Sequence, residues 1–80
     1  MEVNDYDSDI TFGFWLKDRR TAAGLTIEEA SKKSEIPLQR LKSLEIGYAE
    51  KGITYAESQK ICAVYHVPLE ELIKRATQNP

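Results

Sequence analysis

Two Thr-x-x-Glu sequences, Thr26 to Glu29 and Thr54 to Glu57, fix where two helices begin in this chain. In each of them the threonine hydroxyl can accept a hydrogen bond from the backbone N–H of the glutamate. The glutamate carboxylate can in turn accept one from the backbone N–H of the threonine, which completes the capping box of a helix N-terminus. One helix is therefore predicted to follow Thr26 and another to follow Thr54.

Glycines and prolines set the remaining helix boundaries. Gly24 and Gly47 suit the left-handed conformation that ends many helices, while Pro37 and Pro68 suit a first helical turn, where no backbone N–H is required. Between these points apolar residues recur at three- and four-residue steps, which is the period of a helix. The sequence predicts an all-α fold, a compact five-helix bundle with helices over residues 11–23, 27–34, 37–45, 54–65 and 69–76.

Charge is distributed unevenly along the 80 residues, whose net charge is −2. Four acids and no Lys or Arg fall in residues 1–10, a segment without helical periodicity that we expect to be a disordered tail. The net charge of the other residues is near +2, so this part of the chain is less basic than most proteins that bind phosphates tightly. We expect one helix-turn-helix domain over residues 11–76 and a short C-terminal tail over residues 77–80.

Several classes of protein are disfavoured by what the sequence lacks. The one cysteine, Cys62, has no partner for a disulfide, and there is no apolar run near the length of a membrane span and no signal peptide, so we expect a cytoplasmic protein. No paired carboxylates, nucleophile–base set, metal-ligand cluster or glycine-rich phosphate loop is evident, so we expect neither an enzyme nor a cofactor or metal.

A short connection joins the second and third predicted helices. Between Ile27 and Ile46 small or aliphatic residues fall where two crossing helices would meet, at Ala30, Ser31, Ile36, Leu41 and Leu44. This spacing permits the roughly 100–120° crossing of a helix-turn-helix. One helix can then brace against DNA while the other enters the major groove.

The same features continue along most of the chain. The pattern Gly13-x-x-Leu16-Lys17-x-x-Arg20-x-x-x-Gly24-Leu25-Thr26, then Glu45-x-Gly47, then Thr54-Tyr55, resembles the Cro/phage-repressor-like (XRE-type) helix-turn-helix DNA-binding family over residues 12–74. The resemblance implies a lambda-repressor-like domain and a sequence-specific transcriptional regulator whose partner is double-stranded DNA. A homodimer is expected, since one short recognition helix reads too few base pairs for selectivity.

The resemblance also assigns roles to individual positions. It implies that the third helix contacts bases, through Leu38, Gln39, Arg40, Lys42 and Ser43. It implies that the start of the second helix and the loop after Gly47 contact phosphates, through Ile27, Glu28, Tyr48 and Lys51. It implies an ion pair between Arg20 and Glu45. The sequence departs from the family at Ile27, where glutamine is common, and at Glu35, where a turn glycine is usual.

Some residues admit a structural or a functional interpretation. Gln39 and Lys42 either face DNA or are simply solvated. Phe14 and Trp15 are out of phase with Leu16, so at least one should be exposed, either against the tail or the last helix or as a surface for a partner or second subunit.

An alternative function follows from such a surface, a protein-interaction module that kept the fold and lost DNA binding. The apolar residues Ile27 and Leu38 favour this alternative. We also expect Cys62 to be buried, His66 to end a helix in the left-handed conformation, and both Tyr55 and Tyr65 to lie in the core.

Overall fold

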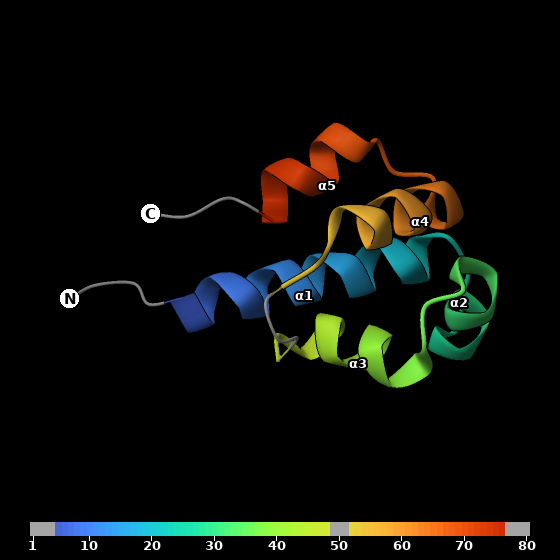
Figure 1. Ribbon diagram of the computed structural model, residues 1–80, viewed down its shortest axis with the longest axis horizontal. Coiled ribbons are helices and arrows are strands. Elements are labelled where there is room, and N and C mark those ends of the chain that lie inside the picture. Colours follow the sequence, from blue (N-terminus) through green and yellow to red (C-terminus); the bar gives the residue numbers. More distant parts are fainter. Residues whose placement is uncertain (1–4, 49–51, 77–80) are drawn as a thin grey trace.

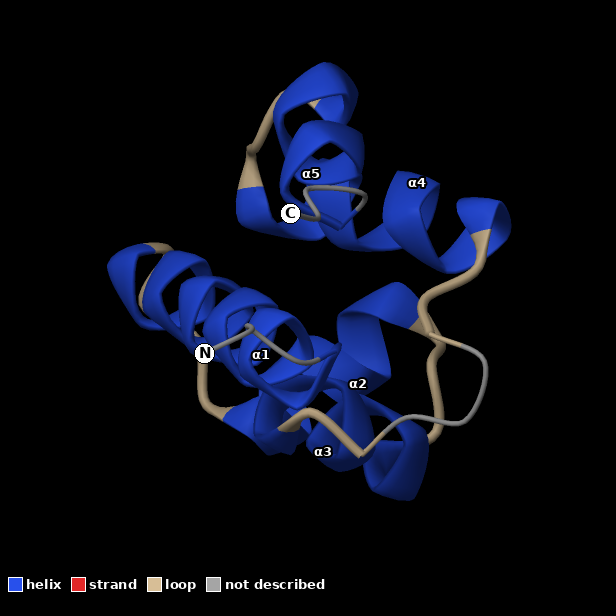
Figure 2. Cartoon of the chain, turned by 90° about the vertical axis from the view of Figure 1, so that its left-hand side faces the viewer, coloured by secondary structure: helices blue, strands red, loops and turns tan. Residues whose placement is uncertain are grey.

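The computed structural model describes residues 5–48 and 52–76, in which all regular structure is helical. The helices are α1 (Asp5–Ala22), α2 (Ile27–Ser34), α3 (Leu38–Ile46), α4 (Tyr55–Tyr65) and α5 (Leu69–Ala76). Helix α1 runs through the middle, with α2 and α3 on one side and α4 and α5 on the other (Figures 1 and 2). The predicted five-helix all-α fold is confirmed, while residues 1–4 of the predicted N-terminal tail (residues 1–10) and the predicted C-terminal tail (residues 77–80) lie outside the described residues.

Helix α1 begins at Asp5, six residues before the predicted start at Thr11. The prediction of a non-helical segment was therefore wrong for residues 5–10. Acidic residues are favourable in the first turns of a helix, because the macrodipole places partial positive charge there. These turns also extend beyond the end of α3 (Figure 1).

Both capping boxes are present as predicted. The Thr26 hydroxyl accepts from the backbone N–H of Glu29 at 3.1 Å, and the Glu29 carboxylate accepts from the N–H of Thr26 at 2.9 Å. Thr54 and Glu57 make the same two hydrogen bonds at the start of α4. Because both signals depend only on residues three apart, the sequence located these helix starts well. Pro37 differs slightly: it is the N-cap of α3 rather than its first helical residue.

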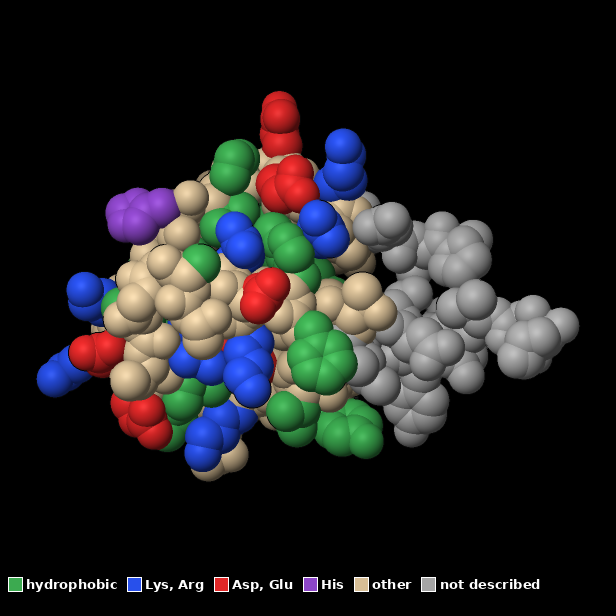
Figure 3. Space-filling view, turned by 180° about the vertical axis from the view of Figure 1, so that it is seen from behind, with side chains coloured by type: hydrophobic (Ala, Val, Ile, Leu, Met, Phe, Trp, Pro, Cys, Tyr) green, Lys and Arg blue, Asp and Glu red, His purple; other side chains and the backbone are tan. Residues whose placement is uncertain are grey.

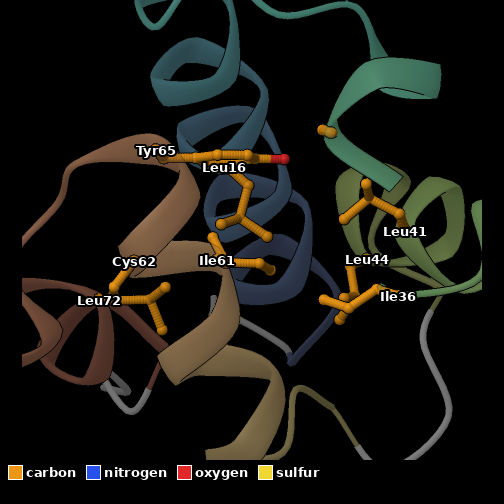
Figure 4. Close-up of a cluster of buried hydrophobic side chains, with 9 residues drawn as sticks. Leu16, Ile36, Leu41, Leu44, Ile61, Cys62, Tyr65 and Leu72 are labelled. Carbon is orange, nitrogen blue, oxygen red and sulfur yellow. The ribbon is translucent and has the colours of Figure 1, made fainter. Parts of the chain in front are cut away.

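The core is formed by apolar side chains from all five helices. Its largest fully buried side chains are Leu16 of α1, Leu41 of α3, Ile61 of α4 and Leu72 of α5 (Figure 4), and Ala30 of α2 is fully buried with them. Cys62 and Tyr65 are buried beside them as expected, and burial raises the pKa of the Cys62 thiol.

Tyr55, which the sequence places in the core, is exposed instead. Tyr55 is 61% exposed because it is the first residue of α4 and lies to the side of the buried row of Ser58, Ile61 and Tyr65. Ile73 follows the buried Leu72 by one residue, about 100° around α5, and is also exposed. The helix that contains Tyr55 was predicted correctly, but its buried face is narrower than the sequence indicated.

Gly13 lets α1 and α3 approach closely. A Cβ atom at this position would lie 2.7 Å from the Glu45 carbonyl carbon and 3.0 Å from the Leu44 oxygen. Both are backbone atoms, so they cannot move aside without moving the helix. The absence of a side chain at Gly13 therefore sets the distance between α1 and the C-terminal end of α3.

Candidate nucleic-acid interface

The turn between α2 and α3 is held by short-range hydrogen bonds. Glu35 ends α2 in the left-handed conformation, with φ 64° and ψ 22°, as expected for a position where glycine is usual. The Ser31 hydroxyl donates to the Ile36 carbonyl at 2.6 Å, and the Ile36 N–H donates to the Ser34 hydroxyl at 3.3 Å. These bonds fix the direction in which α3 leaves α2.

Helix α3 has one buried face and one solvent face. Leu41, Leu44 and Glu45 are buried, whereas Gln39 and Lys42 are exposed on the opposite side. Their side chains make no hydrogen bond or ion pair with any other described residue. Leu38 and Ser43 are half-buried at the edges of this face. The predicted base-reading residues other than Arg40 thus share one accessible strip of α3.

The Arg40 guanidinium is held by hydrogen bonds to other residues of the domain. Its Nε and Nη2 donate to the two carboxylate oxygens of Glu57 at 2.8 and 3.0 Å, and Nη2 also donates to the Gly52 carbonyl at 2.6 Å. The hydrogen bond from Arg40, followed by those from Thr54, keeps the pKa of Glu57 below its usual value despite partial burial. Arg40 was expected beside the bases, but in the structure it ties α3 to the start of α4.

The predicted phosphate-contacting residues lie at different positions around this strip. Ile27 is half-buried and packs against the core, which accounts for an apolar residue there, whereas Glu28 is exposed in the first turn of α2. Tyr48 is 67% exposed just after α3. Lys51 lies outside the described residues.

Arg20 and Glu45 form the ion pair that the sequence implied. Arg20 Nε and Nη2 donate to the two oxygens of Glu45 at 2.7 and 3.1 Å, and Nη1 donates to the Leu25 carbonyl at 2.9 Å. Both residues are buried, and the hydrogen bond that the guanidinium donates to Glu45 raises its pKa despite its desolvation. The pair joins α1 to the end of α3 beneath the exposed strip.

Phe14 and Trp15 point in different directions. Phe14 is 65% exposed. Trp15 is half-buried: its ring stacks on Phe12 with centroids 6.0 Å apart, and the Arg75 guanidinium of α5 lies 5.4 Å from its centroid. Packing within the domain therefore accounts for Trp15, and only Phe14 remains as a candidate interface residue.

The five helices and the exposed strip of α3 together define a helix-turn-helix domain. A family model described as Helix-turn-helix matches residues 16–72, and the chain therefore belongs to this family, the Cro/C1-type or XRE family. DNA binding and transcription regulation fit the family, which is not typically enzymatic. Comparison with curated proteins gives no significant match.

Within residues 5–48 and 52–76 no group of His, Cys, Asp and Glu is arranged to hold a metal ion. None of the helices in these ranges combines the length and the apolar character needed to cross a bilayer.

Proposed function

We propose that this domain is a sequence-specific transcriptional regulator that inserts α3 into the major groove of double-stranded DNA. The observation that carries the proposal is the exposed pair Gln39 and Lys42 on the solvent face of α3, neither of which has a partner in the described chain. A glutamine can bind N6 and N7 of adenine with two hydrogen bonds, and a lysine can donate to O6 and N7 of guanine. The chemistry of base reading is thus present on the right helix.

The residues beside this pair extend the contact. Leu38 offers an apolar surface to a thymine methyl group, and Ser43 offers a hydroxyl to either base or phosphate. Both are only half-exposed, so they contribute at the edges of the strip. Arg40 takes no part in this proposal, because Glu57 and Gly52 already hold its guanidinium.

Phosphate contacts are assigned to the two ends of the strip. The backbone N–H groups of Ile27 and Glu28 lie in the first turn of α2, where a helix offers donors without internal acceptors to phosphate. The Glu28 and Glu29 carboxylates in that turn oppose the contact. Tyr48 and Lys51 are the proposed contacts after α3. With few cations among the proposed contacts, we expect binding of modest affinity and a shallow salt dependence.

Two copies are proposed to act together on a two-fold symmetric site, in the cytoplasm. One nine-residue helix contacts only a few base pairs, and a pair of half-sites one helical turn apart supplies the missing selectivity.

The test is fluorescence anisotropy with a duplex selected from a random pool and with an unselected duplex, over a salt series. Gln39→Ala should cost about 1–3 kcal/mol on the selected duplex and little on the unselected one. Gln59→Ala changes an exposed glutamine on α4 and is the matched control, expected to bind as wild type. Lys42→Ala is compared in the same way with Lys60→Ala. Absence of any binding at low salt refutes the proposal.

The second candidate is a protein-interaction module that has lost DNA binding. The specific observation in its favour is the exposure of three large apolar side chains, Phe14, Ile46 and Tyr48. Under this alternative, none of the duplexes binds at low salt and the exposed apolar residues carry the function.

A further inference from the structure

An apolar patch lies where α1 meets the C-terminal end of α3. It consists of Phe14, Ile46 and Tyr48, which are 65%, 57% and 67% exposed. Gly13 of α1 lies against the backbone of Glu45 in α3, and Phe14 and Ile46 are the residues that follow these two, both exposed near this close approach. The Tyr48 N–H donates to the Ser43 carbonyl at 3.0 Å and keeps Tyr48 next to the end of α3. Hydrophobic side chains gather at the lower right of the face shown in Figure 3.

The rim of this patch is basic. Lys17 follows Phe14 by three residues on α1, and Lys42 precedes Ile46 by four residues on α3, so each lysine shares a helix face with an apolar member of the patch. Both lysines are exposed. An apolar centre with aromatic residues and a charged rim is typical of a protein interface. It calls for a partner that is apolar and acidic.

The first turns of α1 in a second copy meet this requirement. They carry Asp5, Asp7 and Asp9, and the chain has no Lys or Arg before Lys17. We propose that two copies of this chain associate through α1, with the acidic turns of each copy against the basic rim of the other.

A two-fold axis makes this arrangement self-complementary. Phe12 lies midway in sequence between Asp7 and Lys17, and also midway between Ile10 and Phe14. When two antiparallel α1 helices cross at the level of Phe12, Asp7 of each copy is level with Lys17 of the other. Ile10 of each copy is likewise level with Phe14 of the other. A two-fold contact of this kind uses the same patch on both copies and closes the assembly at two.

Association through this patch also affects the recognition helix. Ile46 follows Lys42 by four residues and Gln39 by seven, so all three share the solvent face of α3. A copy docked over Ile46 therefore covers the C-terminal part of the strip proposed to enter DNA. Association through this patch and DNA binding exclude one another, so two copies bound to a two-fold site do not use this contact. This consequence, unlike the association itself, rests on the proposed function.

Sedimentation velocity over a range of protein concentrations, without DNA, tests the association. Wild type should shift from monomer to dimer, and Phe14→Ser should raise the dissociation constant about tenfold or more, as for a central aromatic residue in an interface. Tyr55→Ser, at an exposed tyrosine on α4, is the matched control and should dimerise as wild type. Circular dichroism melts show that each variant is folded. Wild type that stays monomeric means that another partner covers the patch, and it overturns the proposal, as does equal weakening by Tyr55→Ser.

A charge exchange tests the arrangement of the two copies. Asp7→Lys and Lys17→Glu should each weaken the dimer, and the double variant should restore it, because opposite charges again face each other across the axis. A double variant weaker than both single variants overturns the antiparallel arrangement.

Addition of the selected duplex tests the competition. Wild-type dimer should be replaced by protein bound to DNA, with no Phe14-dependent dimer remaining in the complex. A Phe14-dependent dimer that persists on DNA overturns the competition. Failure of every duplex to bind refutes the proposed function alone, since the dimerisation measured without DNA is independent of it.

Discussion

Replacement of Glu45 by alanine removes the carboxylate that neutralises a buried guanidinium. Glu45 is 9% exposed and Arg20 is 8% exposed, and two hydrogen bonds of 2.7 and 3.1 Å join them. After the change, Arg20 keeps only its bond to the Leu25 carbonyl. Breaking a buried ion pair by removing one partner typically costs about 3–5 kcal/mol.

This loss is large for a domain of 80 residues. At roughly 0.05–0.15 kcal/mol per residue its free energy of unfolding is about 4–12 kcal/mol. Each kcal/mol lost lowers the Tm of a domain this small by about 4–8 °C. Glu45→Ala should therefore lower the Tm by at least about 12 °C or leave the domain unfolded at room temperature.

Thermal unfolding followed by circular dichroism measures this effect, and a second ion pair supplies the control. Arg75 and Glu71 pair at 3.2 Å on the surface of α5, with both side chains more than 40% exposed. Exposed pairs of this spacing contribute about 0.3–0.5 kcal/mol, so Glu71→Ala should shift the Tm by only a few degrees. If Glu45→Ala does not fold, Glu45→Gln can replace it. This variant keeps the shape of the side chain and one acceptor, so its Tm should lie below that of wild type and above that of Glu45→Ala. A Glu45→Ala variant that melts within about 2 °C of wild type would refute the reasoning.

Three further changes test other parts of the structure. Gly13→Ala should lower the stability by about 1–3 kcal/mol in chemical denaturation, although alanine favours helices, because its Cβ would press on the backbone of α3. The lowered pKa of Glu57 means that its pairing with Arg40 stabilises the fold fully above the unfolded pKa near 4.5 and is lost as the pH falls through the lower folded value. Glu57→Gln should thus flatten the acid side of the plot of Tm against pH; an unchanged slope contradicts this. Glu35→Gly should raise the stability by up to about 1 kcal/mol, since it relieves a positive φ of 64°, and a lower Tm would show that the strain is absent.

The sequence predicted those helix boundaries that depend on neighbouring residues. The capping boxes at Thr26 and Thr54 each involve two residues three apart, and His66 ends α4 in the left-handed conformation, φ 60°, as expected. Such signals need no knowledge of the rest of the fold. The start of α1 has no comparable signal in the sequence, and it was placed six residues too late.

The candidate site was predicted less completely, because part of it depends on contacts between distant residues. Gln39 and Lys42 were expected on an accessible face of the third helix, and they lie there. Their proposed contacts with DNA stay a prediction. The sequence predicted that at least one of Phe14 and Trp15 would be exposed, but helical phase alone did not show which one. The contact of Trp15 with Arg75 on α5 decides between them.

Arg40 shows how a contact between distant residues can be missed when a helix is read from its sequence alone. Its partner, Glu57, lies 17 residues away and already has a complete local role as the capping residue of α4. In the structure one carboxylate does both: Oε1 accepts from the Thr54 N–H at 2.9 Å and from Arg40 Nη2 at 3.0 Å. A local motif therefore concealed a tertiary contact, because satisfying the cap leaves lone pairs on the same carboxylate for a guanidinium. That contact links α3 to the start of α4, while Gln39 and Lys42 beside Arg40 remain exposed.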